Sequence, residues 1–527
     1  MVSEQTVKGG RACSVLFVAS EAYPLAKTGG LADVCGALPA ALARLGADLC
    51  IMLPGYPQAL DTVLDQRVLC DLPSFGEGET CRLVRGRMPD SGCRVILFDC
   101  PTLFQRDGGL YQDGGGNDWT DNYRRFAAFS RAAAAVAMGE TPLRWRPAVV
   151  HANDWHVGLL PAYLHFRAGP RPKTVFTAHN LAFQGNFPMD VFASLGLPDA
   201  ALSADGLEFY GKVSFLKAGL RYSDRLTTVS PNYAREILSP EHGCGMDGLL
   251  RARAGDLVGI LNGVDYGVWD PATDRALPSV YNADDISGKA ACKAALRAEV
   301  GLPNDDDAPL LIYVNRLTHQ KMADVVLQAL PSVVANGAQL IVHGRGDRDL
   351  EEGFAAAAKR HPGKVKVDVG YRETMAHRMN AGADLSLTPS RFEPCGLTTM
   401  YAMRYGALPV TRAVGGLADT VQDADDNADA TCEGTGFLFE SATLNDLQRC
   451  TERALDRYGE KDAWQRIRRS AMKQDFGWER SARQYLELYA DLLGGADHAA
   501  SGDDRPHRAR RSDARSGTQI GAFSDRP

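Results

Sequence analysis

The sequence predicts an α/β protein with two parallel sheets, and three observations carry this prediction. Short apolar runs recur along the chain, and each is followed by a loop and then a helical pattern. The series stops in a stretch of turn-forming residues and starts afresh near residue 310. The length of 527 residues corresponds to two to four domains at roughly 100–200 residues each. We therefore expect two α/β domains in tandem.

In the first half of the chain, a buried-strand pattern at residues 14–19 precedes a glycine-containing loop and a helical pattern over 31–45. The next apolar run, 48–53, completes a strand–loop–helix–strand unit of the kind that builds parallel sheets. The same alternation predicts further strands at residues 148–151, 173–178 and 225–229.

The second half begins after turn-forming residues around 265–310, so we place the domain boundary near 256–265. Strands are predicted again at 310–314, 339–342, 365–369 and 384–387, each before a loop and a helical pattern. The last segment, 496–527, is rich in Gly, Ala, Asp, Ser and Arg, and Phe523 is its only Phe, Tyr or Trp. Such a segment buries too little apolar area to offset the entropy of ordering, so we expect it to be disordered.

The composition narrows the classes of function. The 58 Lys and Arg against 65 Asp and Glu leave a net charge of −7, which disfavours broad nucleic-acid binding. No apolar run reaches the roughly 18 residues of a membrane span; the alanine-rich stretch 127–138 is short and contains Arg131. The 12 cysteines are scattered without a CxxC pair, so we expect reduced thiols, no zinc site and a cytoplasmic location.

Two loops that follow predicted strands carry cations suited to an anionic ligand. KTGGLAD at 27–33 begins with Lys27 and precedes a helix whose free N–H groups suit a phosphate; a plain tight turn is the alternative. The loop RLTHQK places Arg316 and Lys321 where they can converge on a diphosphate; a solvated loop is the alternative.

The sharpest segment is SRFEPCGLTT at 390–399, between a predicted strand and a helix over 399–405. Glu393 would stand at the carboxyl end of a strand, where open α/β sheets bind ligands. The N–H groups of Gly396, Leu397 and Thr398 would open the helix toward the same ligand. A charge partner for the helix start is the alternative role of Glu393.

Two segments of the first domain, HANDWH (151–156) and TAHNL (177–181), also follow predicted strands. An aromatic ring beside carboxylate and imidazole groups is typical of a carbohydrate site, and the spacing does not match HExxH, so we expect no metal. For each histidine alone, a structural role stays open. The residues expected to face one cleft are Asp154, Trp155, His156 and His179. The acidic run 423–429 contains a DxD, which we interpret as part of a solvated loop.

Taken together, eight segments in order resemble the bacterial glycogen synthases and plant starch synthases, from Val15 to about Leu492. They are KTGGLADV (27–34), HANDWHVGLLPAYL (151–164), TAHNLAFQG (177–185), GLEFYGKVSFLKAGL (206–220), TVSPNYAREI (228–237), GILNGVD (259–265), RLTHQK (316–321) and SRFEPCGLTTMYAMRYGALP (390–409).

The resemblance implies a GT-B fold, in which two Rossmann-like domains face each other across a cleft and a C-terminal helix crosses back to the first domain. It implies an extension at 1–13, an acceptor-side domain at 14–256, a nucleotide-sugar domain at 257–477, the crossing helix at 478–495 and the tail at 496–527. The implied reaction moves glucose from ADP-glucose to the non-reducing 4-OH of an α-1,4-glucan such as glycogen. It proceeds with retention at the anomeric carbon and without a metal or other cofactor.

The resemblance also implies residue roles. Contacts with the donor's phosphates and sugar are implied for Lys27, Gly30, Asn262, Arg316, Lys321, Glu393, Gly396, Leu397 and Thr398, and stacking on the base for Tyr371. On the acceptor side the implied residues are Asp154, Trp155 and His156. The residues implied at the reacting centre are His179, Asp154, Glu393, Arg316 and Lys321.

Three positions depart from the family pattern. Met322 stands where the family usually has Gly, Asn153 replaces a histidine of HAHDWH, and Arg345 is unusual within a Gly-rich turn.

Three alternative functions stay open: a UDP-glucose-using transferase, a transferase with another acceptor, and a non-catalytic glucan-binding or regulatory homologue.

Overall fold

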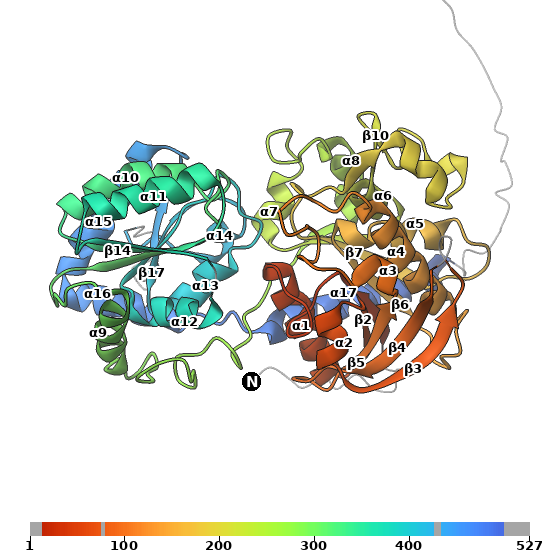
Figure 1. Ribbon diagram of the computed structural model, residues 1–527, viewed down its shortest axis with the longest axis horizontal. Helices are drawn as coiled ribbons and strands as arrows, with labels where there is room; N and C mark the ends of the chain where they lie inside the picture. Colours follow the sequence, from red (N-terminus) through yellow and green to blue (C-terminus); the bar gives the residue numbers. More distant parts are fainter. Residues whose placement is uncertain (1–12, 75–78, 371, 426–433, 500–527) are drawn as a thin grey trace, which may run out of the picture.

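The computed structural model describes residues 13–74, 79–370, 372–425 and 434–499, which form two domains with separate sheets (Figure 1). The predicted α/β class is confirmed, because each domain contains parallel strands connected by helices. Tyr371 and residues 500–527 lie outside the described residues, so the predicted role of Tyr371 and most of the predicted tail cannot be placed.

The first sheet has nine strands in the order β12-β11-β7-β6-β1-β2-β5-β4-β3. It is parallel from β12 to β5, whereas β4 pairs antiparallel with both β5 and β3. The sequence did not predict this antiparallel extension. The strand bounds are β1 Ser14–Val18, β2 Asp48–Pro54, β3 Leu64–Leu72, β4 Cys81–Arg87, β5 Arg94–Asp99, β6 Val149–Asn153, β7 Lys173–Ala178, β11 Arg225–Thr228 and β12 Leu257–Gly259.

A small antiparallel sheet, β8-β10-β9, projects from the first domain. Its strands are β8 Asn186–Pro188, β9 Glu208–Phe209 and β10 Lys212–Ser214. The α-helices described in this domain are α1 Gly30–Arg44, α2 Pro57–Thr62, α3 Pro101–Phe104, α4 Asn122–Met138, α5 Leu159–His165, α6 Phe215–Tyr222, α7 Pro231–Glu236 and α8 Asp247–Ala252.

The second sheet has six parallel strands in the order β15-β14-β13-β16-β17-β18. Their bounds are β13 Leu310–Val314, β14 Gln339–Gly344, β15 Val365–Val369, β16 Leu385–Thr388, β17 Leu408–Arg412 and β18 Phe437–Phe439. The helices are α9 Gly288–Val300, α10 Ala323–Ala335, α11 Arg348–Arg360, α12 Glu373–Gly382, α13 Leu397–Arg404, α14 Gly415–Thr420, α15 Leu444–Gly459, α16 Lys461–Met472 and α17 Trp478–Ala499.

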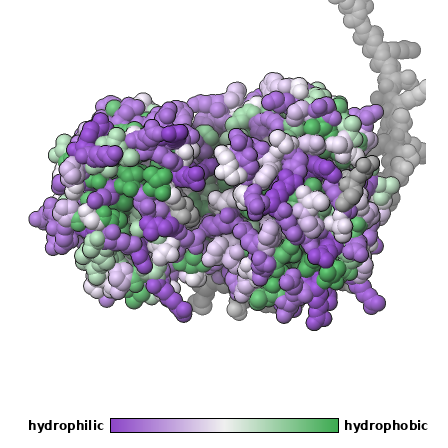
Figure 2. Space-filling view, in the orientation of Figure 1, coloured by the Kyte–Doolittle hydropathy of each residue, from purple (hydrophilic) through white to green (hydrophobic). Residues whose placement is uncertain are grey.

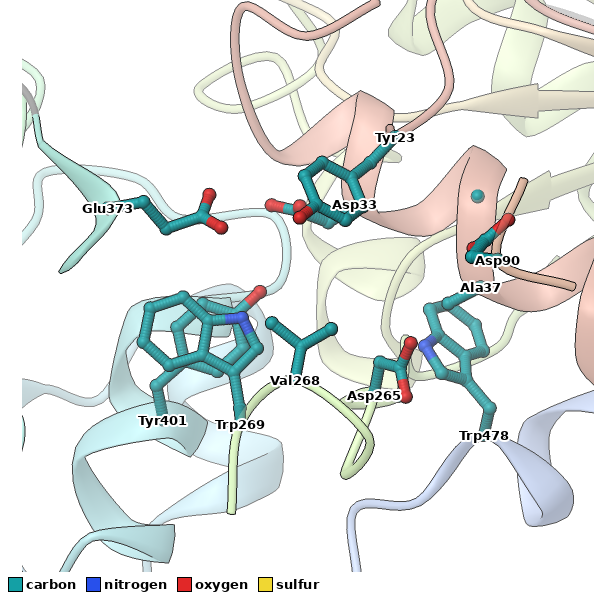
Figure 3. A pocket seen from close by; sticks show the side chains of 12 residues that line it. Tyr23, Asp33, Ala37, Asp90, Asp265, Val268, Trp269, Glu373, Tyr401 and Trp478 are labelled. Atoms are coloured by element: carbon teal, nitrogen blue, oxygen red, sulfur yellow. The ribbon is translucent and has the colours of Figure 1, made fainter. Parts of the chain in front are cut away.

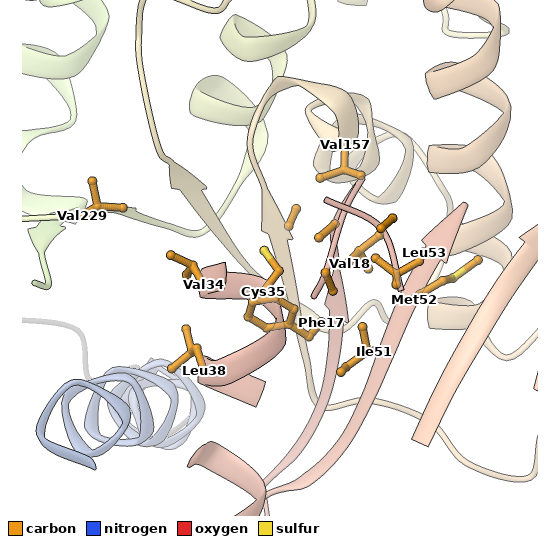
Figure 4. Close-up of a cluster of buried hydrophobic side chains, with 14 of the residues drawn as sticks. Phe17, Val18, Val34, Cys35, Leu38, Ile51, Met52, Leu53, Val157 and Val229 are labelled. Carbon is orange, nitrogen blue, oxygen red and sulfur yellow. The ribbon is translucent and has the colours of Figure 1, made fainter. Parts of the chain in front are cut away.

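Helix α1 covers one face of the first sheet because its apolar residues recur every three to four positions. Val34, Cys35 and Leu38 point into a cluster that includes Phe17 of β1 and Ile51 of β2 (Figure 4). Both faces of β1 and β2 are buried, which explains the near-continuous apolar runs that predicted these two strands.

Helix α17 crosses back from the second domain and packs against α1 of the first, as expected for a GT-B fold. Its buried residues Trp478, Tyr485 and Tyr489 lie on one stripe at helical spacing. The Tyr489 hydroxyl lies 2.7 Å from His151 Nδ1 in β6, which anchors the helix to the first sheet. The helix extends to Ala499, four residues past the predicted end at 495.

The two domains touch where α7 of the first meets α14 of the second. The backbone N–H of Gly415 donates to Glu236 Oε1 at 2.8 Å, and the Ser230 hydroxyl donates to the Pro394 carbonyl at 2.8 Å. A recess separates the domains on the face shown in Figure 2. Among the described residues, no helix combines the length and apolar character needed to cross a membrane.

Candidate functional site

The sequence-predicted groups of the second domain meet at the carboxyl ends of β13 and β16. Lys321 follows β13 and Glu393 follows β16, and their charged groups form an ion pair. The Ser390 hydroxyl donates a further hydrogen bond to Glu393 Oε2 at 2.9 Å. The two residues are 72 positions apart, but β13 and β16 are neighbouring parallel strands, so both loops leave the same edge of the sheet. Glu393 is only 9% exposed, which strengthens its interactions with cations.

The start of α13 requires glycine. Gly396 caps the helix with φ of 88°, a left-handed conformation that side chains disfavour. A Cβ at this position would lie 2.6 Å from the Leu417 side chain. The helix begins at Leu397, two residues before the predicted start. The N–H groups of its first turn, including those of Leu397 and Thr398, have no acceptor within the helix and carry the positive end of its dipole.

The start of α1 in the first domain lies against the start of α13. A Cβ at Gly30 would lie 3.3 Å from Cδ1 of Leu397. Two loops that the sequence predicted to hold one donor molecule are therefore in contact across the domain boundary. A larger side chain at position 30 would press on Leu397.

Lys27 is engaged by carboxylates from both domains. Its ammonium lies 2.7 Å from Asp33 Oδ1 in α1 and 2.6 Å from Glu373 Oε2 at the start of α12. These contacts bridge the domains and involve neither Arg316 nor Lys321, although the resemblance implies that all three cations contact one donor. A donor phosphate that binds Lys27 would have to displace or join these carboxylates.

Glu21 organises the loop after β1, and it was not predicted from the sequence. The buried carboxylate accepts hydrogen bonds from the Thr28 N–H at 2.6 Å, the Thr28 hydroxyl at 2.9 Å and the Tyr111 hydroxyl at 2.8 Å. Burial raises its pKa above the ordinary value. An acidic residue two positions after the apolar run 14–19 was the signal that could have identified it.

Asp154 follows β6 in a strained conformation, with φ of 65°. Its N–H donates to the Thr177 carbonyl at 2.9 Å, and its Oδ1 accepts from the Trp155 N–H at 3.1 Å. The side chain is 5% exposed, and burial raises its pKa to about 8. The carboxyl group therefore holds a proton at neutral pH.

His179 and Asn153 come together at the ends of β7 and β6. The Asn153 side-chain N–H₂ donates to the Val18 carbonyl at 3.2 Å and the His151 carbonyl at 3.3 Å, so Oδ1 faces His179 Nε2 at 3.1 Å. An amide oxygen can only accept, which assigns the ring proton to Nε2 and leaves Nδ1 as an acceptor. Burial lowers the pKa of His179 to about 3 and keeps the ring neutral.

Trp155 and His156 pack mainly against other rings of the first domain. The centroids of these two rings are 4.0 Å apart in a stacked arrangement. The Tyr111 ring also stacks on His156, with 4.4 Å between the centroids. A Cβ at Gly185 would lie 2.2 Å from the Trp155 ring. His156 is buried, and its Nδ1 has no hydrogen-bond partner among the described residues. The structure thus places His156 inside the domain and Trp155 at its half-buried rim.

Asn262 lies beside the loop of the second domain that carries Glu393 and Cys395. It is buried near the Cys395 thiol, and its side-chain oxygen lacks a partner among the described residues. Burial raises the pKa of Cys395 to about 12, so this thiol stays neutral. Arg316 is exposed, and its guanidinium lies 5.7 Å from the centroid of the Phe183 ring in the first domain.

Two family models match the chain: the starch synthase catalytic domain over residues 14–252 and glycosyl transferases group 1 over residues 297–471. The glycogen synthase of Burkholderia thailandensis is 53% identical to it over 95% of each chain. That of Paramagnetospirillum magneticum is also 53% identical, over 91% of this chain and 98% of the relative. The chain belongs to the glycogen and starch synthase family.

A solved structure supports the same assignment. The catalytic domain of starch synthase IV from Arabidopsis thaliana, bound to ADP and acarbose, matches with a TM-score of 0.85 at 32% identity. The match covers 92% of this chain and 100% of that chain. The expected GT-B fold and the expected class of enzyme, a glycosyltransferase of the glycogen synthase type, are confirmed.

The unusual Met322 of this family member keeps the backbone conformation that glycine favours, with φ of 54°. Its side chain is fully buried in the core of the second domain. The side chain therefore does not crowd the loop that carries Lys321, and burial of the apolar group offsets part of the strain. Arg345, the third departure, is exposed.

The DxD of the acidic run is held by arginines of α15. Asp423 accepts from both Nη atoms of Arg453, at 2.8 and 2.7 Å, and Asp425 pairs with Arg457 at 2.5 Å. These ion pairs replace the solvated loop predicted for this part of the run; residues 426–433 lie outside the described residues.

A small cavity between the domains has no room for a nucleotide sugar. It is lined by the acidic partners of Lys27 and by aromatic rings that include Trp269, Tyr401 and Trp478 (Figure 3). Its volume of about 20 Å³ suits about one water molecule, and neither Lys321 nor Glu393 lines it.

Proposed function

We propose that this family member transfers glucose from ADP-glucose to the non-reducing 4-OH of an α-1,4-glucan, with retention of anomeric configuration. The observation that carries the proposal is the contact of α1 with the start of α13 beside the Lys321–Glu393 ion pair. The relatives named glycogen synthase support a glucan product. The ADP bound in the starch synthase IV structure supports adenine as the base of the donor nucleotide.

The donor's diphosphate would bind the cations of the second domain. Breaking the glucosyl–phosphate bond builds negative charge on the departing diphosphate. Arg316, Lys321 and the N–H groups from Gly396 to Thr398 supply fixed positive charge for that group, and such preorganised charge lowers the barrier. Lys27 would add to it once the phosphate competes with Asp33 and Glu373, and Tyr371 is proposed to stack on the base.

The transferred glucose would lie between Glu393 and the first domain. The sugar acquires oxocarbenium-like positive charge in the transition state, and the Glu393 carboxylate favours that charge. The partnerless side-chain oxygen of Asn262 can accept a sugar hydroxyl. Protonated Asp154 can donate to a hydroxyl, whereas neutral His179 can accept one at Nδ1.

The acceptor glucan would enter along Asp154, Trp155 and His156 of the first domain. Retention follows from attack on the face that the phosphate leaves: the 4-OH oxygen bonds the anomeric carbon while its proton passes to the departing phosphate oxygen. No covalent enzyme intermediate forms in this scheme. A trapped glucosyl-enzyme would refute it.

Domain closure would complete the site. We propose that residues 14–256 and 257–477 move as two units, with the helix at 478–495 linking them, because the donor groups and the acceptor groups lie on different domains. Closure excludes water and suppresses donor hydrolysis. Identical small-angle scattering with and without ADP-glucose plus glycogen would contradict a large motion. We also propose a cytoplasmic location, supported by the scattered cysteines of the sequence.

The decisive experiment incubates the enzyme with radiolabelled ADP-glucose and glycogen, then digests the product with an enzyme specific for α-1,4 linkages. We expect label in the polymer, released by the digestion. Competition with UDP-glucose tests the base, and label in a soluble disaccharide would overturn the glucan acceptor.

A matched pair of variants tests the site. Glu393→Gln removes the buried carboxylate that pairs with Lys321, while Glu440→Gln makes the same change at an exposed position of the same domain. We expect loss of transfer only in the first variant. Equal activity of the two would show that Glu393 is not part of the site.

A further inference from the structure

Two cysteines of the first domain face each other at the end of an antiparallel strand pair. Cys81 opens β4, and Cys100 directly follows β5. Arg82 pairs with Asp99 in the β4–β5 register, so the two cysteines are the next opposite positions. Their Sγ atoms are 3.1 Å apart, with exposures of 1% and 0%. Opposite residues in antiparallel strands have the backbone separation that a disulfide requires.

The hydrogen bonds around the pair make the two sulfurs unequal. The Cys81 thiol donates to Cys100 Sγ, and the Thr102 hydroxyl lies 3.6 Å from the same sulfur. The bond from Cys81 is the largest cause that lowers the pKa of Cys100 below its ordinary value, and burial opposes it. Cys100 is thus the better nucleophile, and Cys81 lies in position to react with it next.

The neighbouring Glu79 raises the alternative of a metal site, because its carboxylate lies within 4.8 Å of both sulfurs. Two distances disfavour this alternative. Arg124 already engages the Glu79 carboxylate at 2.5 Å. Two thiolates on a tetrahedral zinc ion, with Zn–S of about 2.3 Å, would lie about 3.8 Å apart rather than 3.1 Å.

We propose that Cys81 and Cys100 form a peroxide-sensitive dithiol that closes into an intramolecular disulfide. The Cys100 thiolate attacks hydrogen peroxide, which forms a sulfenic acid and releases hydroxide. The Cys81 sulfur then displaces the hydroxyl of the sulfenic acid, and the proton of its thiol leaves with that group as water. In sum, two thiols and one peroxide give one disulfide and two water molecules. The sulfurs move together by about 1 Å to reach the bond length of about 2.05 Å.

The burial of both sulfurs predicts which reagents reach them. Hydrogen peroxide is close to water in size, whereas a bulky alkylating reagent needs the strand end to open. Cys244 is exposed and distant in sequence, so it provides an internal comparison for the access of each reagent.

Strands β4 and β3 form one edge of the nine-stranded sheet, opposite β12, so the cross-link would join elements away from the loops proposed to bind the donor.

The experiment treats the reduced full-length protein with hydrogen peroxide, removes the peroxide with catalase, unfolds the protein in excess iodoacetamide and maps the peptides by mass spectrometry. We expect a cross-linked pair of peptides that contains Cys81 and Cys100, lighter by two hydrogen atoms and separated by dithiothreitol. The variant Cys244→Ser is the matched control and should give the same cross-link. In Cys81→Ser, dimedone present while the peroxide-treated protein unfolds should trap a sulfenic acid at Cys100.

Three outcomes would overturn the proposal. The first is that Cys81 and Cys100 both remain alkylatable under conditions that oxidise Cys244. The second is that Cys81→Ser yields no sulfenic acid at Cys100 although circular dichroism shows a native fold. The third is one bound equivalent of zinc that is lost in Cys81→Ser while the wild-type protein forms no cross-link, which would identify a metal site instead. The cross-link in the wild-type protein tests the proposal even if the variant does not fold.

Discussion

Changing Asn153 to aspartate should raise the pKa of His179 by about 1–3 units. The substitution replaces the amide oxygen that lies 3.1 Å from His179 Nε2 with a carboxylate oxygen of nearly the same shape. A carboxylate at this distance stabilises the imidazolium, and opposite charges within 4–6 Å shift a pKa by about that amount. The second carboxylate oxygen would face the carbonyls of Val18 and His151, which opposes ionisation of the new side chain and favours the lower end of the range. The His179 pKa of about 3 would therefore move to about 4–6. A rise of two units increases the protonated fraction at pH 6 about a hundredfold.

The assay is a pH titration of the His179 ring by NMR, with the resonance assigned by its loss in His179→Gln. In the wild-type protein, the nitrogen shifts should report a proton on Nε2 and none on Nδ1 down to pH 5. The kcat of Asn153→Asp should decline on the acidic side at a higher pH than that of the wild type, because the imidazolium no longer accepts at Nδ1. A wild-type His179 that titrates near 6.5, or one that carries its proton on Nδ1, would refute the reasoning.

Three further predictions concern the same site. Glu393→Gln should lower kcat/KM at least about a hundredfold, because the neutral amide no longer favours the oxocarbenium-like charge of the sugar and removal of one such preorganised group costs about a hundredfold or more; a loss below tenfold in steady-state kinetics would contradict this. Gly396→Ala should cost about 1–2 kcal/mol for the left-handed backbone alone and raise the donor KM. The control Gly459→Ala, where a Cβ meets nothing within 4 Å, should leave the donor KM unchanged. Equal donor KM values for Gly396→Ala and Gly459→Ala would contradict the predicted rise for Gly396→Ala. The folded-state pKa of Asp154, about 8, lies above the unfolded value of about 3.9, so the folded state binds this proton more tightly and stability falls as pH rises between those values. In urea unfolding, the free energy of unfolding should fall less between pH 5 and pH 8 for Asp154→Asn than for the wild type. An equal fall in the two proteins would be inconsistent with the raised pKa.

The loops of the donor side could be predicted because parallel sheets place consecutive strand ends at one edge. Lys321 and Glu393 each follow an apolar run that predicted a buried strand, and neighbouring strands bring the two loops together. The prediction of Gly396 at a helix start likewise rests on a local pattern, and its φ of 88° agrees with the need for glycine. Family resemblance added the expected roles but no distances.

Several features escaped the sequence because their partners are remote. Lys27 pairs with Glu373, 346 positions away, and no local pattern indicates that contact. The hydrogen bond of Tyr111 to Glu21 spans 90 positions. The edge strand β3 was missed because it is largely exposed and lacks an apolar run of the kind that identified strands such as β1 and β13.

Periodicity and turn residues along the chain were enough to establish two α/β domains and to place the charged loops at the ends of particular strands. These features depend on residues within one helical turn or one strand of each other, so they are written locally in the sequence. The ionisation of Asp154, the tautomer of His179 and the partners of Lys27 were decided by tertiary packing. Each depends on how completely the fold excludes water and which distant group it places within about 3 Å, and neither quantity can be read from neighbouring residues.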